Sequence, residues 1–133
     1  MNKYKMINLL NDMSNIVHGD NLEKGFEKQA IPIALMLVVT ELSEAVEADR
    51  KNRSANLEEF EKWLCRITGT HLTDADYALN FEKYVKDSFE DEIADAFIRL
   101  FDFCGGHGVN IGKHIQYKLR YNRTREYKHG CKY

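Results

Sequence analysis

With 133 residues, 44% of them hydrophobic and 30% charged, the chain is long enough for one globular domain with its own core. A net charge of −2 argues against nucleic acid as the main partner. The longest apolar run, residues 30–39, is about half a membrane span, and the first residues lack the apolar core of a secretory signal. We therefore expect a single cytoplasmic domain over residues 1–133 that associates with neither membranes nor nucleic acids.

A single proline and few alternating β-branched residues predict an all-α chain, a bundle of four to six helices. Apolar positions recur at helical spacing over about residues 3–17, 32–50, 57–67, 74–105 and 111–124. The segment His18-Gly19-Asp20-Asn21 predicts the end of the first helix. Pro32 suits the first turn of the second helix, because the missing N–H would have no partner there anyway.

The remaining helix ends also carry local signals. Thr73 or Asp74 can cap the helix that follows, and a break near Ser88 is left open by the pattern. Gly105-Gly106 predicts the end of that stretch, and Asn110 caps the last helix.

Two acidic motifs carry the strongest chemical signal: Glu41-Leu42-Ser43-Glu44 and Glu92-Ile93-Ala94-Asp95. Carboxylates at i and i+3 of a helix lie on one face, about 5–6 Å apart. Two such helices packed face to face would bring four carboxylates into one pocket, where they would repel each other and lose hydration. A hard divalent cation removes this conflict, so the motifs predict a carboxylate site for Mg²⁺.

The apolar neighbours of these acids strengthen the prediction. On a helical projection Glu41 lies among Val38 and Ala45, and Glu92 lies among Ala96 and Phe89. Carboxylates are almost never fully buried without a partner. Acids on the apolar face of two matched motifs are therefore unlike the solvated charges of ordinary amphipathic helices.

The C-terminal region is basic. Its last 21 residues hold seven Lys or Arg residues and one acid, Glu126. Lys118, Asn122 and Arg125 follow the i, i+4, i+7 spacing of one helical face. Cations of this kind suit a triphosphate, although a solvated basic helix end would show the same pattern.

The three cysteines are Cys65, Cys104 and Cys131, an odd and unclustered set that does not predict a disulfide framework. Pairing Cys104 with His107, and Cys131 with His129, gives poor spacing for zinc. We expect Cys104 to be a buried packing residue.

Taken in order, these motifs resemble the MazG-like branch of the all-α nucleoside triphosphate pyrophosphohydrolases. The family pattern is Glu-x-x-Glu on one helix and Glu-x-x-Asp on the next, which maps onto the motifs at 41–44 and 92–95. The segment 118–130 resembles the family's Lys-x-x-x-Asn segment and basic tail, and the resemblance covers roughly residues 15–130. Two departures are Thr40, where the family often has Glu, and residues 51–88, which lengthen the connection between the motifs.

The resemblance implies hydrolysis of a (deoxy)nucleoside triphosphate between the α and β phosphates, which would remove unwanted triphosphates from nucleotide pools. It implies Mg²⁺, with Mn²⁺ as a substitute, and a homodimer or homotetramer. The residues that it assigns fall into three groups. The metal ligands are Glu41, Glu44, Glu92 and Asp95. The carboxylate that orients the attacking water is Glu44 or Glu47. The phosphate-binding residues are Lys118, Asn122 and Arg125. Beside these, His18, Phe26 and Trp63 are candidates to contact the base, because aromatic rings stack on bases, and a core position is the equal alternative for each.

Three alternatives remain beside this interpretation. A di-iron carboxylate bundle needs Glu-x-x-His motifs, which neither acidic motif supplies. A non-enzymatic helical interaction or regulatory module would use the same charges only for binding. A phosphoribosyl-ATP pyrophosphohydrolase shares the superfamily and its chemistry, and only the resemblance of the tail separates it.

Overall fold

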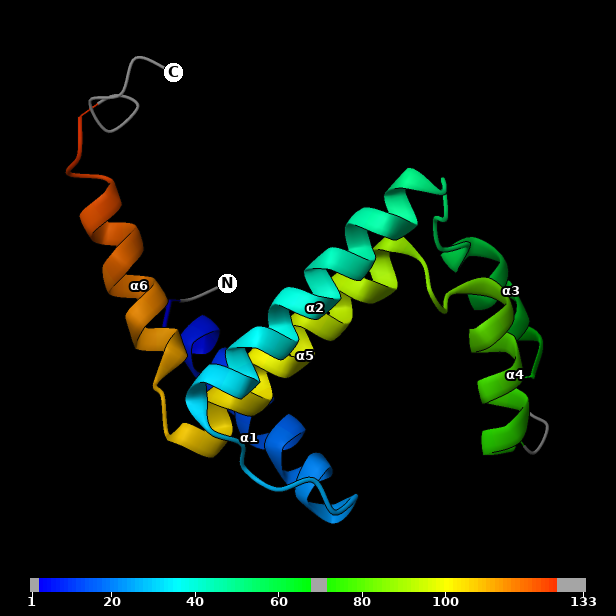
Figure 1. Cartoon of the computed structure of the whole chain (residues 1–133), viewed down its shortest axis with the longest axis horizontal. Helices are drawn as coiled ribbons and strands as arrows, with labels where there is room; N and C mark the ends of the chain where they lie inside the picture. Colours follow the sequence, from blue (N-terminus) through cyan, green and yellow to red (C-terminus); the bar gives the residue numbers. More distant parts are fainter. Residues whose placement is uncertain (1–2, 68–71, 127–133) are drawn as a thin grey trace. The chain divides into compact units, whose positions relative to one another are not determined.

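The computed structural model describes residues 3–67 and 72–126, and within these ranges it contains six α-helices and no strand. The helices, shown in Figure 1, are α1 (Lys3–Glu23), α2 (Ile31–Arg50), α3 (Leu57–Ile67), α4 (Asp74–Tyr84), α5 (Phe89–His107) and α6 (Ile111–Asn122). For these residues, the prediction of an all-helical chain with four to six helices is confirmed. Across the described ranges, no helix is both long and apolar enough to cross a membrane.

The contacts divide the chain into two compact units. Unit 1 combines Met1–Ile31 with Leu100–Tyr133, and unit 2 is the continuous segment Pro32–Arg99. Helix α5 therefore contributes residues 89–99 to unit 2 and its remaining residues to unit 1. The expectation of one domain over residues 1–133 stays a prediction.

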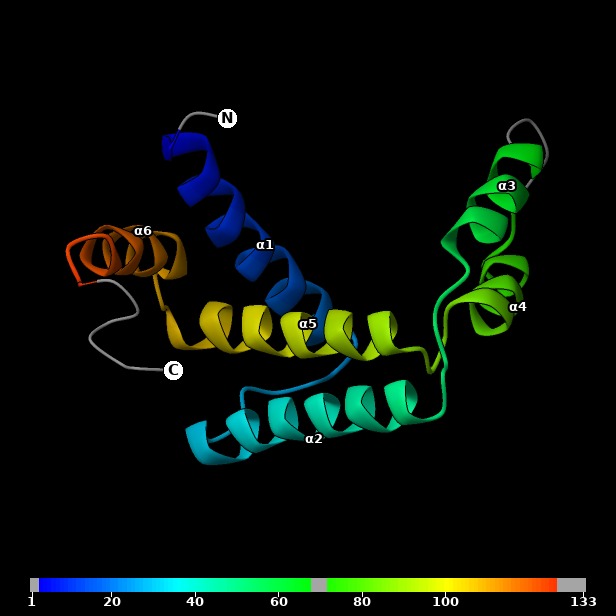
Figure 2. The ribbon, with the colours of Figure 1, turned by 90° about the horizontal axis from the view of Figure 1, so that it is seen from above.

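Unit 2 contains α2, the beginning of α5, and the pair α3 and α4. In both ribbon views α2 and the beginning of α5 lie side by side and run in opposite directions (Figures 1 and 2). The buried apolar side chains of these two segments are small: Val38, Ala45, Ala48 and Ala96. Small side chains let helix axes approach closely, which brings polar side chains of both helices within reach of each other.

Helices α3 and α4 form a hairpin around one buried ring, that of Phe60. Its centroid lies 5.6 Å from that of Trp63, 5.5 Å from that of Tyr77 and 6.0 Å from that of Phe81. Two backbone hydrogen bonds hold the base of the hairpin, from Asn56 N to Tyr84 O at 2.8 Å and from Phe89 N to Arg53 O at 3.0 Å. The lengthened connection at residues 51–88 is therefore an ordered helical hairpin within its described residues.

Unit 1 packs α1 closely against α6 and the end of α5 through glycines. A Cβ on Gly112 would lie 2.8 Å from Ile7 Cα, and a Cβ on Gly105 would lie 2.7 Å from His18 Cβ. The Asn11 side chain donates to Asn110 Oδ1 at 3.0 Å and accepts from Gly112 N at 3.1 Å. These positions have no room for a larger residue.

The prediction that the first helix ends at residues 18–21 is wrong, because α1 continues to Glu23. His18 Nδ1 lies 2.8 Å from Asp102 Oδ1, and this contact with a remote segment favours helix where local composition favours a turn. The chain leaves the helix near Gly25, whose φ of +85° suits glycine.

The prediction that Gly105-Gly106 ends a helix is also wrong. Helix α5 continues to His107, and the residue in the left-handed conformation is Gly108, with a φ of +65°. Gly105 and Gly106 instead provide space for α1, since a Cβ on either would clash with His18.

Other predicted helix ends are confirmed. Pro32 lies in the first turn of α2, Thr73 accepts from Asp76 N to cap α4, and Asn110 accepts from Lys113 N to cap α6. The break that the sequence pattern left open exists, and Ser88 Oγ accepts from Asp91 N at the start of α5. Cys104 is buried, as expected for a packing residue.

Candidate metal centre

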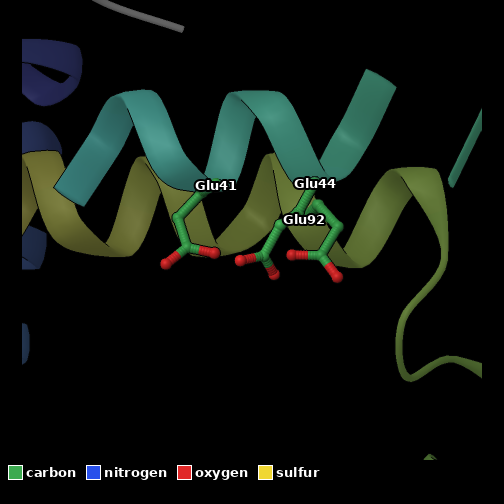
Figure 3. Close-up of side chains that lie close together, drawn as sticks. All are labelled: Glu41, Glu44 and Glu92. Atoms are coloured by element: carbon green, nitrogen blue, oxygen red, sulfur yellow. The ribbon is translucent and has the colours of Figure 1, made fainter. Parts of the chain in front are cut away.

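Glu41 and Glu44 on α2 meet Glu92 on α5. One carboxylate oxygen from each of the three lies within 4.8 Å of the others. Figure 3 shows the three side chains next to one another on the same side of the helix pair. Three of the four ligands predicted from the sequence therefore converge, and we call these three residues the carboxylate cluster.

Two of the three carboxylates in the cluster are withdrawn from water. Glu41 is 5% exposed and Glu92 is 7% exposed, whereas Glu44 is exposed. The helical spacing of each motif explains the buried position, because Glu41 shares the face of buried Val38 and Ala45. When the apolar faces of α2 and α5 pack together, the carboxylates of Glu41 and Glu92 are therefore buried as well.

Burial and mutual repulsion change the acidity of the cluster. Burial, followed by the charges of Glu44 and Asp91, raises the pKa of Glu92 from its ordinary value of 4.5 to about 7. Without a cation, Glu92 is therefore only partly ionised near pH 7. A cation that binds here would restore the ionised form, and its binding would release protons.

Asp95, the fourth predicted ligand, is not among the three converging residues, although it lies in their electrostatic field. Burial raises its pKa, and the charges of Asp91 and Glu41 raise it further, while Arg99 lowers it. Asp95 is partly buried on α5, one turn beyond Glu92. Its assignment as a metal ligand stays a prediction.

Glu47 is an exposed residue on α2. Lys51 Nζ lies 2.9 Å from its carboxylate and Arg50 Nη1 lies 3.5 Å from it, so local cations pair with this side chain. Glu44, in contrast, belongs to the carboxylate cluster. Of the two residues predicted to orient water, the structure therefore brings Glu44 to the other acids.

Arg99 is a residue of the site that was not predicted from the sequence. Its Nε donates to Oε1 of Glu41, which supplies the partner that a buried carboxylate requires. Arg99 follows Glu92 by seven positions and Asp95 by four, so helical spacing alone places it on the face of the second motif. This spacing was the feature of the sequence from which the position of Arg99 could have been predicted.

The residues predicted to contact a base have varied surroundings. His18 pairs with Asp102, and its ring lies against Gly106. Trp63 packs against Phe60 within the α3–α4 hairpin. Phe26 lies outside the helices and is 62% exposed. A role for any of them in binding a base stays a prediction.

The residues predicted to bind phosphate lie on α6 and just after it, in unit 1. Lys118 Nζ lies 5.1 Å from the ring centroid of Tyr121, and Lys118 also lines a shallow hollow of about 290 Å³ on α6. The Oδ1 of Asn122 is buried and has no hydrogen-bond partner among the described residues, and Arg125 is exposed. The end of the basic tail, and with it His129 and Cys131 of the zinc alternative, lies outside the described residues.

The donor set of the cluster fits a hard divalent cation. Carboxylate oxygens are the ligands that Mg²⁺ and Ca²⁺ prefer, and three of them converge from two helices. Their chemistry does not by itself select Mg²⁺. Comparison with protein-family models, with curated proteins and with solved structures found no match to this chain.

Proposed function

We propose that this protein is a Mg²⁺-dependent nucleoside triphosphate pyrophosphohydrolase of the MazG-like class, which hydrolyses a (deoxy)nucleoside triphosphate to the monophosphate and pyrophosphate. The observation that supports it most is the convergence of Glu41, Glu44 and Glu92 from the two motif helices. Two of these three carboxylates are buried, which is unfavourable for acids that only serve solubility.

We assign the following roles to residues of this chain. Glu41, Glu44 and Glu92, with Asp95, would hold the cation. When bound, Mg²⁺ would neutralise charge on the phosphate oxygens as the α–β bridge breaks. Exposed Glu44, or Glu47, would orient the attacking water and accept its proton.

Binding of the substrate would depend on cations and on aromatic groups. Lys118, Asn122 and Arg125 would bind the phosphates, Asn122 through the N–H donors of its side-chain amide. Addition of one water across the α–β bridge gives the monophosphate and pyrophosphate, so the reaction requires no other co-reactant.

The resemblance also implies a homodimer or homotetramer. In support, α2 exposes Leu35, Val39, Leu42 and Val46. Their spacing of four, three and four residues places them on one side of the helix, which is typical of a seam between helices. We propose that a second copy of the chain covers this stripe.

The test is pyrophosphate release from a panel of NTPs and dNTPs, with Mg²⁺ and with EDTA. We expect release that needs Mg²⁺ and falls at least about a hundredfold in Glu92→Gln, as for loss of a preorganised electrostatic group. Glu61→Gln is the matched control, since Glu61 is an exposed acid on α3 outside the cluster. Orthophosphate as the product would refute the bond assignment. Absence of turnover by folded protein with Mg²⁺ would favour the non-enzymatic module.

A further inference from the structure

The ion pair between Arg99 and Glu41 joins a partly exposed side chain to a buried one. The Glu41 side chain is 7% exposed, whereas that of Arg99 is 41% exposed. The guanidinium therefore reaches into the cluster from solvent, and only its Nε contact with Oε1 of Glu41 holds it there among the contacts described. A partner placed in this way can leave without opening the helix pair.

The single positive charge of Arg99 is also too small to neutralise the carboxylate cluster. Glu41, Glu44 and Glu92 bring three carboxylates together from two helices, Asp95 lies in their electrostatic field, and Arg99 forms an ion pair with Glu41. The side chain of Glu92 has neither a hydrogen bond nor an ion pair with any described residue, although it is only 7% exposed. A nearly buried carboxylate without a partner, placed beside two others, is unfavourable when ionised unless a cation binds next to it.

We propose that Arg99 is a displaceable counter-ion of the carboxylate cluster: it neutralises Glu41 in the cation-free protein, and a divalent cation competes with it for that carboxylate. A guanidinium and a divalent cation on the same partly dry carboxylate repel each other, so each weakens binding of the other. Arg99 acts here as a positioning residue that sets the affinity of the site. The inference rests on the proposed function, because it assumes that the cluster binds a divalent cation.

The experiment is titration of the full-length protein with Mn²⁺ by calorimetry, since Mn²⁺ is a probe for an all-oxygen site. Arg99→Gln removes the competitor and is expected to bind Mn²⁺ about five- to tenfold more tightly, between the effect of an exposed ion pair and that of a buried hydrogen bond to a charged group. Lys62→Gln is the control, because it also removes a cation paired with carboxylates, those of Glu58 and Glu59, but lies outside the cluster. Its Mn²⁺ affinity is expected to match that of the unmodified protein.

Thermal unfolding provides a second readout that does not depend on activity. Without a cation, Arg99→Gln is expected to melt below the unmodified protein, and saturating Mn²⁺ is expected to raise its Tm by more. If Arg99→Gln does not fold, Arg99→Lys keeps the charge but loses the Nε contact, and its Mn²⁺ affinity is expected to rise in the same direction.

Each result separates this inference from the function on which it rests. Unchanged or weaker Mn²⁺ binding by Arg99→Gln, with the unmodified protein binding Mn²⁺, would overturn the inference and leave the metal site intact. Failure of the unmodified protein to bind Mn²⁺ would refute both. Tighter binding by Arg99→Gln without any triphosphate hydrolysis would support the inference and refute only the enzymatic function.

Discussion

Replacing Glu92 by Gln tests whether repulsion within the carboxylate cluster lowers the stability of the folded protein when no cation is bound. The raised pKa means that the folded protein holds a proton on Glu92 that the unfolded chain releases above about pH 4.5. The contribution of Glu92 to the stability of the folded protein therefore falls as the pH rises from about 4.5 through about 7, and this loss is complete above the folded-state pKa. Glutamine has a similar shape and no charge, so it avoids this loss.

The size of the effect follows from the pKa. The difference between 4.5 and about 7 corresponds to about 3 kcal/mol. This value is an upper limit for Glu92 alone, because the neighbouring acids titrate together with it. At pH 8 in EDTA, Glu92→Gln is therefore expected to be about 2–3 kcal/mol more stable than the unmodified protein, and at pH 4.5 the two should agree.

The assay is urea unfolding in EDTA at several pH values between 4.5 and 8.5, followed by circular dichroism. Taking the difference between the two proteins removes the contributions of all other titrating groups, and Glu61→Gln is the control for a loss of charge elsewhere. Saturating Mn²⁺ should reverse the order, because only the unmodified cluster binds the cation fully. Lower stability of Glu92→Gln at pH 8 in EDTA, or a difference independent of pH, would refute the reasoning.

Four further substitutions test the packing and assembly. Gly105→Ala adds a Cβ against α1 and should lower the stability of the protein by about 1–3 kcal/mol, measured by thermal unfolding, whereas Gly19→Ala in open space should raise it by up to about 1 kcal/mol. Equal effects of the two substitutions would contradict the close packing described. Phe60→Ala removes the central ring of the hairpin and should cost about 3–5 kcal/mol in urea unfolding, and a loss below about 1 kcal/mol would mean that the ring is not a core residue. Leu42→Lys places a charge in the exposed stripe of α2 and should shift the protein to monomer in light scattering, and an unchanged mass would exclude that stripe as the interface.

Local signals in the sequence were sufficient for most of the fold. The apolar periodicity predicts helices, and Pro32, Thr73 and Asn110 mark three of their starts, because each acts through contacts within a few residues of itself. The pairing of Glu41 with Glu44 on one face is likewise a property of the helix alone. The approach of Glu92 to both was predicted from the apolar neighbours of each acid.

Only the tertiary structure decided the features that depend on contacts between remote segments. Gly105 and Gly106 read as a helix end by composition, yet they are packing positions for α1, and His18 extends α1 through its contact with Asp102. The pairing of Arg99 with Glu41 joins residues 58 positions apart, and the pKa of Glu92 depends on burial that no local pattern specifies. Helical spacing determined which side chains share a face, whereas the packing of those faces determined which charges meet and how strongly they interact.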